Sequence, residues 1–193
     1  MKEISERKLQ VIKTAERLFS ERGYLATSVR DLAQALNIEA ASLYSHVKSK
    51  EDLLWTIADR SAQEFFQNVE PIAQQNIQNQ EKLTQMIIAH VGVIADNLDA
   101  SAVFFREWRH LSDPRLSQYA ETRGNYERIF RNVVREGVEE GIFKTYDDGF
   151  STRTILSAIN WTHTWYRPDG ELTATEIGEN LANFLLNGLV RSI

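Results

Sequence analysis

The first 50 residues carry the side chains best suited to bind a polyanion. They hold nine Lys and Arg against six Asp and Glu, whereas the other 143 residues hold 13 Lys and Arg against 21 Asp and Glu. The whole chain has a net charge of −5. A basic segment on an acidic chain favours a local anion-binding surface over a general basic coat.

Polar groups at two places in this segment could contact DNA. Thr27 and Ser28 would place hydroxyls and helix N-terminal amides near a phosphate. A second group begins at Ala40. Its first side chains are small and would let the backbone approach the major groove. The hydroxyl, imidazole and ammonium groups that follow are typical of phosphate contacts. The predicted DNA-binding residues are Thr27, Ser28, Val29, Ala40, Ala41, Ser42, Tyr44, His46, Lys48 and Lys50.

These residues lie on a predicted helix-turn-helix. The hydrophobic pattern predicts an amphipathic helix over 5–22 that ends at Gly23. Ser28 with Asp31 resembles a capping box and starts a supporting helix over 28–36. Asn37 tolerates the left-handed turn before a recognition helix over 39–46. Such a second helix reads base edges in the major groove.

The rest of the chain also predicts helices and no strand. Further helix starts are indicated by Ser49 with Asp52, by Asp113-Pro114 and by Thr173 with Glu176. The sequence has only 9 Gly and 3 Pro. We predict an all-α fold of about nine helices, with a three-helix DNA-binding domain over 1–48 and a larger helical domain over 49–193.

The composition argues against an enzyme. The absence of cysteine rules out disulfides and thiolate chemistry. The four histidines have no metalloprotease spacing, and there is no glycine-rich phosphate loop. Catalytic triads assemble from distant positions, but nothing here points to one. We expect no catalytic residue, metal or cofactor, and no membrane partner, because no apolar run or signal segment is present; the expected location is cytoplasmic.

Residues 8–55 resemble the TetR family of bacterial transcriptional regulators. The matching residues are Leu18-Phe19, Gly23-Tyr24, Thr27-Ser28-Val29, Leu32-Ala33, Leu43-Tyr44-Ser45-His46 and Ser49-Lys50-Glu51. Three positions depart from the family pattern: Asn37 replaces a usual Gly, Glu39 a usual Ser or Thr cap, and Val47 a usual Phe. Glu is a weaker helix cap, and its charge near DNA could alter sequence choice.

The resemblance implies a homodimer that binds double-stranded operator DNA through its N-terminal helices. The C-terminal domain would bind a small ligand and dimerise through its last two long helices, about 149–166 and 173–191. A two-fold dimer predicts a palindromic operator. The predicted interface residues are Ile155, Ile159, Thr162, Ile177, Leu181, Phe184, Leu185 and Leu189.

Aromatic residues interleaved with arginines follow residue 103 and could line a ligand pocket. Arginine would suit a phosphate or carboxylate. The predicted pocket residues are Phe104, Phe105, Trp108, Arg109, Tyr126, Phe130, Trp161 and Trp165. The alternative is that these aromatics form ordinary core and that the arginines pair with acids.

Residues 106–111 and 160–177 resemble the corresponding segments of TetR-type regulators that respond to acyl-CoA thioesters. The implied effector is a small hydrophobic or acyl-CoA-like molecule; a free fatty acid or a drug-like aromatic is the alternative. We therefore expect a repressor whose effector tilts the helix starting at Ser49. The competing hypothesis is a helical ligand-binding or interaction module that does not bind an operator.

Overall fold

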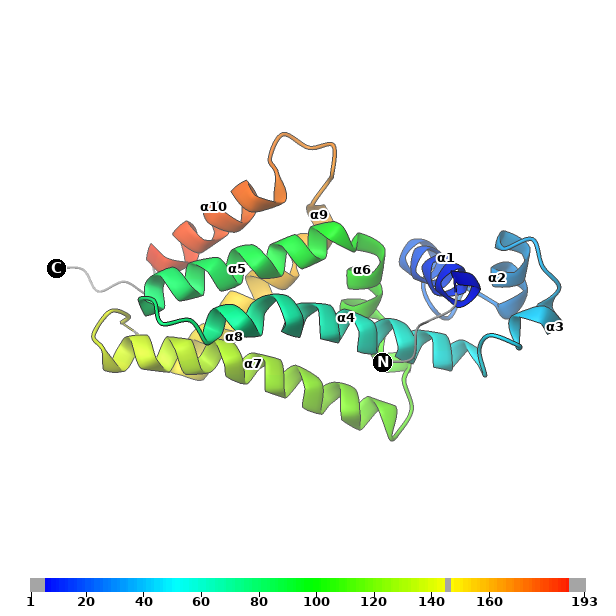
Figure 1. Ribbon diagram of the computed structural model, residues 1–193, viewed down its shortest axis with the longest axis horizontal. Coiled ribbons are helices and arrows are strands. Elements are labelled where there is room, and N and C mark those ends of the chain that lie inside the picture. Colours follow the sequence, from blue (N-terminus) through cyan, green and yellow to red (C-terminus); the bar gives the residue numbers. More distant parts are fainter. Residues whose placement is uncertain (1–5, 145–146, 188–193) are drawn as a thin grey trace. The chain divides into compact units, whose positions relative to one another are not determined.

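The computed structural model describes residues 6–144 and 147–187 (Figure 1). These residues form ten α-helices, one short 3₁₀ helix and no β-strand, which confirms the predicted all-α fold. In chain order the helices are α1 (Glu6–Arg22), α2 (Val29–Ala35), α3 (Ala40–Leu43), α4 (Lys50–Ala73), α5 (Asn79–Asp96), α6 (Leu98–Arg106), η1 (Trp108–His110), α7 (Arg115–Glu139), α8 (Asp148–Asn160), α9 (Thr162–Trp165) and α10 (Ala174–Asn187).

The chain forms two compact units. The first unit contains the residues up to Ala62 together with Leu98–Ala120, and the second contains Gln63–Asn97 together with the residues from Glu121 onward. Helices α4 and α7 therefore each begin in the first unit and end in the second. The sequence pattern predicts a single domain boundary after residue 48. In the structure the first unit also includes α6, η1 and the start of α7, which pack with the N-terminal helices.

The helix-turn-helix of the first unit forms where local signals predict it. Helix α1 buries the apolar face that begins with Val11 and Ile12. Gly23 has φ +87°, and the turn after α2 is made by Asn37 with φ +53°, both in the left-handed region that Gly and Asn tolerate. Ser28 caps α2 in a full capping box with Asp31. These features fix where α2 and α3 begin and end.

The recognition helix is shorter than predicted. Helix α3 covers Ala40–Leu43, and the following residues continue as turns. Its N-cap residue is Glu39, whose side chain makes no capping hydrogen bond. A Glu side chain is a poor cap, so one of the usual stabilising bonds of a helix N-terminus is missing here.

The second unit is built around the packing of α5 against α10, which run side by side in Figure 1. Gly178 of α10 permits this contact, because a Cβ at that position would lie 2.8 Å from Cα of Ile88 on α5. Helix α8 packs on both α5 and α10. The core of this unit is apolar and includes Leu83 and Ile87 of α5 and Phe130 of α7.

The two long C-terminal helices predicted over 149–166 and 173–191 have different bounds in the structure. The first is broken at Trp161 into α8 and α9, and the second is α10, starting at Ala174 after a capping box of Thr173 with Glu176. Residues 188–191 lie outside the described part of the chain.

No single helix among the described residues is long and apolar enough to cross a bilayer. Helices α5 and α6 reach the required length and composition only as a pair, which is interrupted at Asn97.

Candidate nucleic-acid interface and effector site

The face of α3 presents small and polar side chains to solvent. Ala41, Ser42 and Tyr44 are exposed, with 55% of Tyr44 accessible, while Leu43 is fully buried and anchors the helix. Ala40 and His46 are half-buried, and Lys48 is exposed. A short helix that exposes small side chains at its N-terminal end can approach base edges in the major groove.

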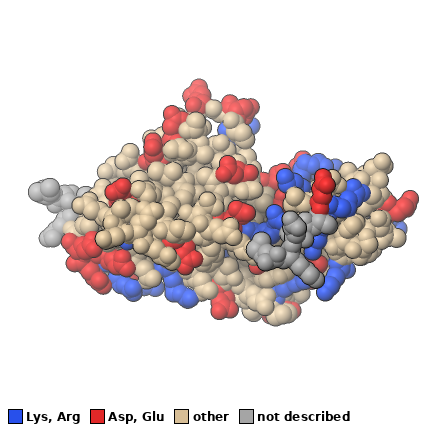
Figure 2. All heavy atoms as spheres, viewed as in Figure 1, with Lys and Arg blue, Asp and Glu red and all other residues tan. Residues whose placement is uncertain are grey.

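Figure 2 shows Lys and Arg side chains over the face of the first unit in view, with fewer Asp and Glu among them. The second unit shows mainly Asp and Glu around its edge in the same view. This agrees with the excess of basic residues before residue 51. A locally positive surface attracts the phosphate backbone without regard to sequence.

Thr27 does not offer its hydroxyl to solvent. Its side chain is fully buried, and its hydroxyl donates a hydrogen bond to the carbonyl oxygen of Gly23 at 2.9 Å and of Leu18 at 3.2 Å. Its backbone N–H donates to the carbonyl of Tyr24. The prediction that the Thr27 hydroxyl meets a phosphate is therefore wrong; this residue holds the turn between α1 and α2.

Ser28 is exposed, but its polar groups are bonded within the capping box. Its backbone N–H and its hydroxyl both donate to the Asp31 carboxylate, at 2.7 and 2.5 Å. These bonds hold the pKa of Asp31 below its usual value. Val29, the first residue of α2, is half-buried. A phosphate near this end of α2 would have to compete with a carboxylate already bound there.

Lys50 points mainly into the protein. Its ammonium donates to the carbonyl oxygens of Tyr24 at 2.8 Å and Thr27 at 2.9 Å and lies 4.1 Å from the centroid of the Tyr24 ring. Desolvation lowers the pKa of this ammonium. Because an ammonium has three donors, at most one remains for a phosphate. Lys50 thus connects the start of α4 to the turn before α2.

Contacts from Leu98–Ala120 to the N-terminal helices are a feature that sequence analysis missed. The carboxylate of Glu107 accepts from the backbone N–H of Tyr24 at 3.3 Å, and the ring of His110 stacks on the Tyr24 ring at 5.5 Å. Arg106 donates to the carbonyl of Ser20 at 3.1 Å. The partners are more than 80 residues apart in sequence, so no local pattern indicates them.

Three further bonds hold the start of α4. The backbone N–H and the hydroxyl of Ser112 donate to Glu51 at 3.0 and 2.7 Å and lower the pKa of this carboxyl. Arg115 pairs with Asp52 at 2.7 Å. The first turn of α4 is therefore fixed on both sides, by Lys50 toward the helix-turn-helix and by these bonds toward the start of α7.

The predicted pocket residues fall into two separate groups. Phe104, Phe105, Trp108 and Arg109 belong to the first unit. There the Tyr119 ring stacks on Trp108 at 5.6 Å, and the Tyr119 hydroxyl donates to the Phe104 carbonyl at 2.7 Å. Phe104 is buried and Arg109 is exposed, with its Nε–H donating to the carbonyl of Arg106. This group packs as an aromatic core.

Tyr126 and Phe130 meet a buried histidine in the second unit. Nδ1 of His90 lies 2.8 Å from the Tyr126 hydroxyl, and Phe65 stacks on the His90 ring at 4.6 Å. Burial lowers the pKa of His90 to about 3, against a weaker opposing effect of its hydrogen bond with Asn160, and burial raises the pKa of Tyr126. The histidine is therefore neutral at pH 7, a polar group enclosed by aromatic rings.

His90 cannot be singled out from the sequence, because a lone histidine on an apolar helix face carries no spacing signal. The other two predicted pocket residues are on the surface of the second unit: Trp161 is 64% exposed and Trp165 is 45% exposed. Neither packs into the core of that unit. Both tryptophans are therefore surface residues of the second unit, and their place in a ligand pocket stays a prediction.

The predicted interface residues also separate into two classes. Four have their side chains in the interior of the second unit, with at most 5% exposed: Ile155, Ile159, Thr162 and Ile177. For these four the prediction of contact with a partner subunit is wrong, because one apolar stripe does not distinguish intramolecular from intermolecular packing. Leu181 and Leu185 are half-buried and Phe184 is 79% exposed, whereas Leu189 lies outside the described residues.

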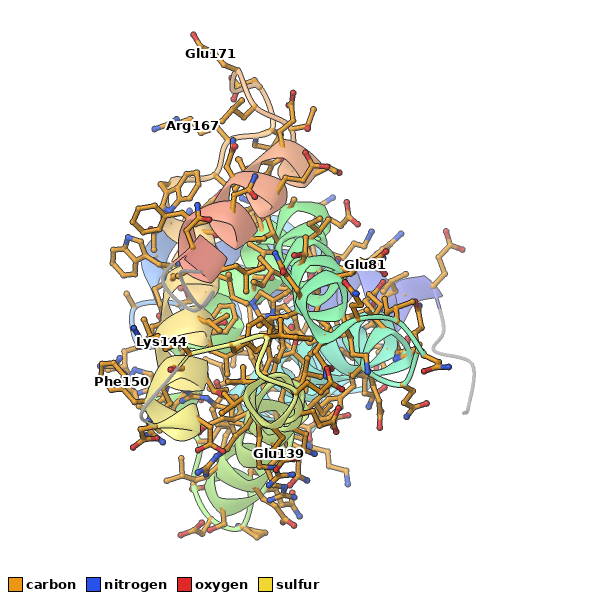
Figure 3. All side chains as sticks on the ribbon, turned by 90° about the vertical axis from the view of Figure 1, so that its left-hand side faces the viewer. Glu81, Glu139, Lys144, Phe150, Arg167 and Glu171 are labelled. Atoms are coloured by element: carbon orange, nitrogen blue, oxygen red, sulfur yellow. The ribbon has the colours of Figure 1, made fainter. Side chains whose placement is uncertain are left out.

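Large apolar side chains remain exposed on α8, α9 and α10. Besides Phe184 and the two tryptophans, Phe150 is 67% exposed. Figure 3 shows Phe150 on the outer side of α8, pointing away from the other helices. Exposed aromatic residues gathered on helices that pack together mark an interaction surface more often than an ordinary solvent face. Among the described residues, no group of three or more His, Asp or Glu side chains could hold a metal ion.

Comparison with known proteins identifies the class of this chain. Residues 11–55 match the family model described as bacterial regulatory proteins, tetR family, and residues 76–189 match the tetracyclin repressor-like C-terminal domain. The chain is 28% identical over 190 residues to the HTH-type transcriptional repressor KstR2 of Mycolicibacterium smegmatis, covering 97% of this chain and 93% of the relative.

Solved structures show the same fold. The TetR family transcriptional regulator PfmR from Thermus thermophilus is 32% identical, with a TM-score of 0.85 over 94% of this chain and 99% of that chain. AibR, solved in complex with isovaleryl coenzyme A and operator DNA, has a TM-score of 0.84 over 93% of this chain and 97% of that chain, at 23% identity. The chain belongs to the TetR family. It is a DNA-binding transcriptional regulator and not an enzyme.

Proposed function

We propose that the protein is a homodimeric repressor that binds a palindromic operator and is released from it by a small hydrophobic effector with acyl-CoA-like chemistry. The observation that carries this proposal is the α2–α3 helix-turn-helix with an exposed α3 face, in a chain that matches the family's N-terminal and C-terminal models. Its relative KstR2 is a transcriptional repressor by name.

DNA contacts are proposed for the residues that remain accessible around α3. Base edges would be reached by Ala40, Ala41 and Ser42, and phosphates by Tyr44, His46 and Lys48. Ser28 and Val29 would lie at the edge of the interface. Lys50 acts chiefly by holding the turn at Tyr24, and only secondarily on a phosphate.

The dimer is supported by the exposed apolar face of the second unit. This face offers aromatic and aliphatic surface of the kind enriched at interface cores. It consists of exposed Phe150, Trp161, Trp165 and Phe184 and half-buried Leu181 and Leu185. Two copies related by a two-fold axis would present two α3 helices to successive major grooves, which requires an operator with two-fold symmetry.

The effector site is proposed around Tyr126, Phe130 and His90 in the second unit. Aromatic side chains with a few neutral polar groups among them suit the apolar part of a ligand. An acyl thioester fits such surroundings, and the fold is shared with AibR, which was solved with isovaleryl coenzyme A and operator DNA. The effector must bind the released geometry more tightly than the DNA-bound geometry, since otherwise it shifts nothing.

The test begins with selection of bound duplexes from a random library, followed by titration of the winner at two salt concentrations. We expect a palindromic sequence and an affinity that falls steeply with salt. Absence of any enriched duplex would contradict operator binding. Acyl-CoAs of increasing chain length are then added to the complex, with free coenzyme A and the matching fatty acids as controls. Release by the fatty acid alone would contradict the thioester.

A further inference from the structure

The carboxylate of Glu39 stands at the start of the recognition helix without a partner among the described residues. Glu39 is the N-cap of α3, with extended backbone (φ −67°, ψ 142°), and its side chain makes no capping bond. The side chain is exposed, and no hydrogen bond or ion pair joins it to another residue in the described part of the chain. Its acceptors are therefore available to a ligand.

The neighbouring side chains leave Glu39 as the ionised group at this end of the helix. Ala40 and Ala41 have no polar side-chain atoms, and the hydroxyl of Ser45 is used in a 2.7 Å bond to the carbonyl of Ser42. The N-terminal residues of a recognition helix are those that contact base edges. Glu39 thus occupies a position where its chemistry decides which base fits.

An ionised carboxylate can only accept hydrogen bonds. Phosphates repel this carboxylate, so at a DNA interface its favourable partner is a base that offers a hydrogen-bond donor. In the major groove the donors are the N4 amino group of cytosine and the N6 amino group of adenine; adenine places its N7 acceptor beside the donor, where it would oppose the second carboxylate oxygen. Cytosine carries no such acceptor next to its amino group, so it is the better partner.

We propose that Glu39 selects cytosine at one position in each operator half-site by accepting a hydrogen bond from its N4 amino group. This inference rests on the proposed operator binding through α3. It makes Glu39 a specificity residue, whereas Tyr44 and Lys48 strengthen binding without regard to sequence.

The test is the variant Glu39→Gln, which keeps the side-chain length and adds a donor. Glutamine pairs bidentately with adenine N6 and N7, so the preferred base at that position should change from cytosine to adenine. We expect each protein to prefer its own base by about tenfold, measured by competition between duplexes that differ at that position in both half-sites. Glu179→Gln, at an exposed position of α10 in the second unit, removes the same charge and should leave base preference unchanged.

Glu39→Ala should bind with no preference at this position while keeping its preferences elsewhere. An unchanged cytosine preference in both Glu39 variants, with α-helical content equal to wild type, would overturn the assignment. A uniform gain in affinity for all duplexes, matched by Glu179→Gln, would also overturn it, because it would show only loss of repulsion. If the wild-type protein enriches no duplex, operator binding itself fails and this assignment fails with it.

Discussion

The ammonium of Lys50 is directed at the Tyr24 carbonyl and lies over the ring of the same residue, 2.8 Å from the oxygen and 4.1 Å from the ring centroid. One side chain from the start of α4 therefore holds the turn that leads into the helix-turn-helix. Glu107 binds the backbone N–H of the same tyrosine. The orientation of α2 and α3 thus depends on Tyr24 being held from two directions.

Replacing Lys50 should affect folding as well as DNA binding. Lys50→Met keeps the chain length but removes both charge-assisted hydrogen bonds, and we expect it to lower the free energy of unfolding by about 1–2 kcal/mol. Operator affinity should fall to a similar degree for all sequences. Lys48→Met removes an exposed charge, so it should leave stability unchanged and reduce the salt slope by about one. Equal stability of the two variants in urea denaturation would contradict the positioning role of Lys50.

The close approach of α5 and α10 gives a steric prediction. In Gly178→Ala the new methyl group would lie 2.8 Å from Cα of Ile88, which is backbone and cannot rotate away. We expect a destabilisation of about 1–3 kcal/mol. Gly92→Ala, on α5, adds a methyl group that meets nothing within 4 Å beyond the adjoining backbone of its own helix, so it should stabilise the protein by about 0.5–1 kcal/mol through helix propensity. Thermal unfolding of both variants tests the pair, and equal shifts would contradict the contact.

Burial of His90 predicts a specific pH dependence. Its pKa is about 3 in the folded protein and about 6.5 in an unfolded chain. As pH falls below about 6.5 the unfolded chain takes up a proton that the folded protein does not, so stability decreases by about 1.4 kcal/mol per pH unit until the pH approaches 3. Urea denaturation from about pH 7 to about pH 4 should show this slope relative to His90→Asn, which keeps a polar group but does not titrate. Parallel profiles would mean that His90 is accessible to solvent protons when folded.

The exposed phenyl ring of α10 tests the proposed dimer. Phe184→Ser should shift the protein toward monomer without unfolding it, because the ring is 79% exposed. Leu25→Ser removes a side chain that is 73% exposed in the first unit and should leave the oligomeric state unchanged. Sedimentation at micromolar concentration distinguishes the two. A Phe184 variant with the mass of wild type would place the dimer contact elsewhere.

Local chemistry made much of the fold predictable. Ser28 with Asp31 and Thr173 with Glu176 form the predicted capping boxes, and Gly23 and Asn37 adopt the predicted left-handed backbone. Such signals are contained within a few residues, so a single sequence shows them. They also located the helix-turn-helix correctly.

The direction of side chains was less predictable. The sequence pattern predicts binding surfaces for Thr27 and Ile155, which are interior, and a ligand pocket for Trp161, whose side chain is exposed in the chain. A helical stripe of apolar residues shows which face is buried but not what covers it. The contacts of Tyr24 with Glu107 and of His90 with Tyr126 join residues 83 and 36 positions apart, and nothing in either segment alone indicates the other.

The discontinuity of the first unit has a consequence for engineering. A chimaera that transplants only residues 1–48 onto another regulator would leave behind Arg106, Glu107 and Lys50, which hold Ser20 and Tyr24 in place. The portable DNA-reading module is instead made of two separate stretches, one ending at Ala62 and one running from Leu98 to Ala120. Because two of the three junctions fall inside α4 and α7, a graft must also preserve the residue count of both helices: one inserted residue turns everything beyond it by about 100°.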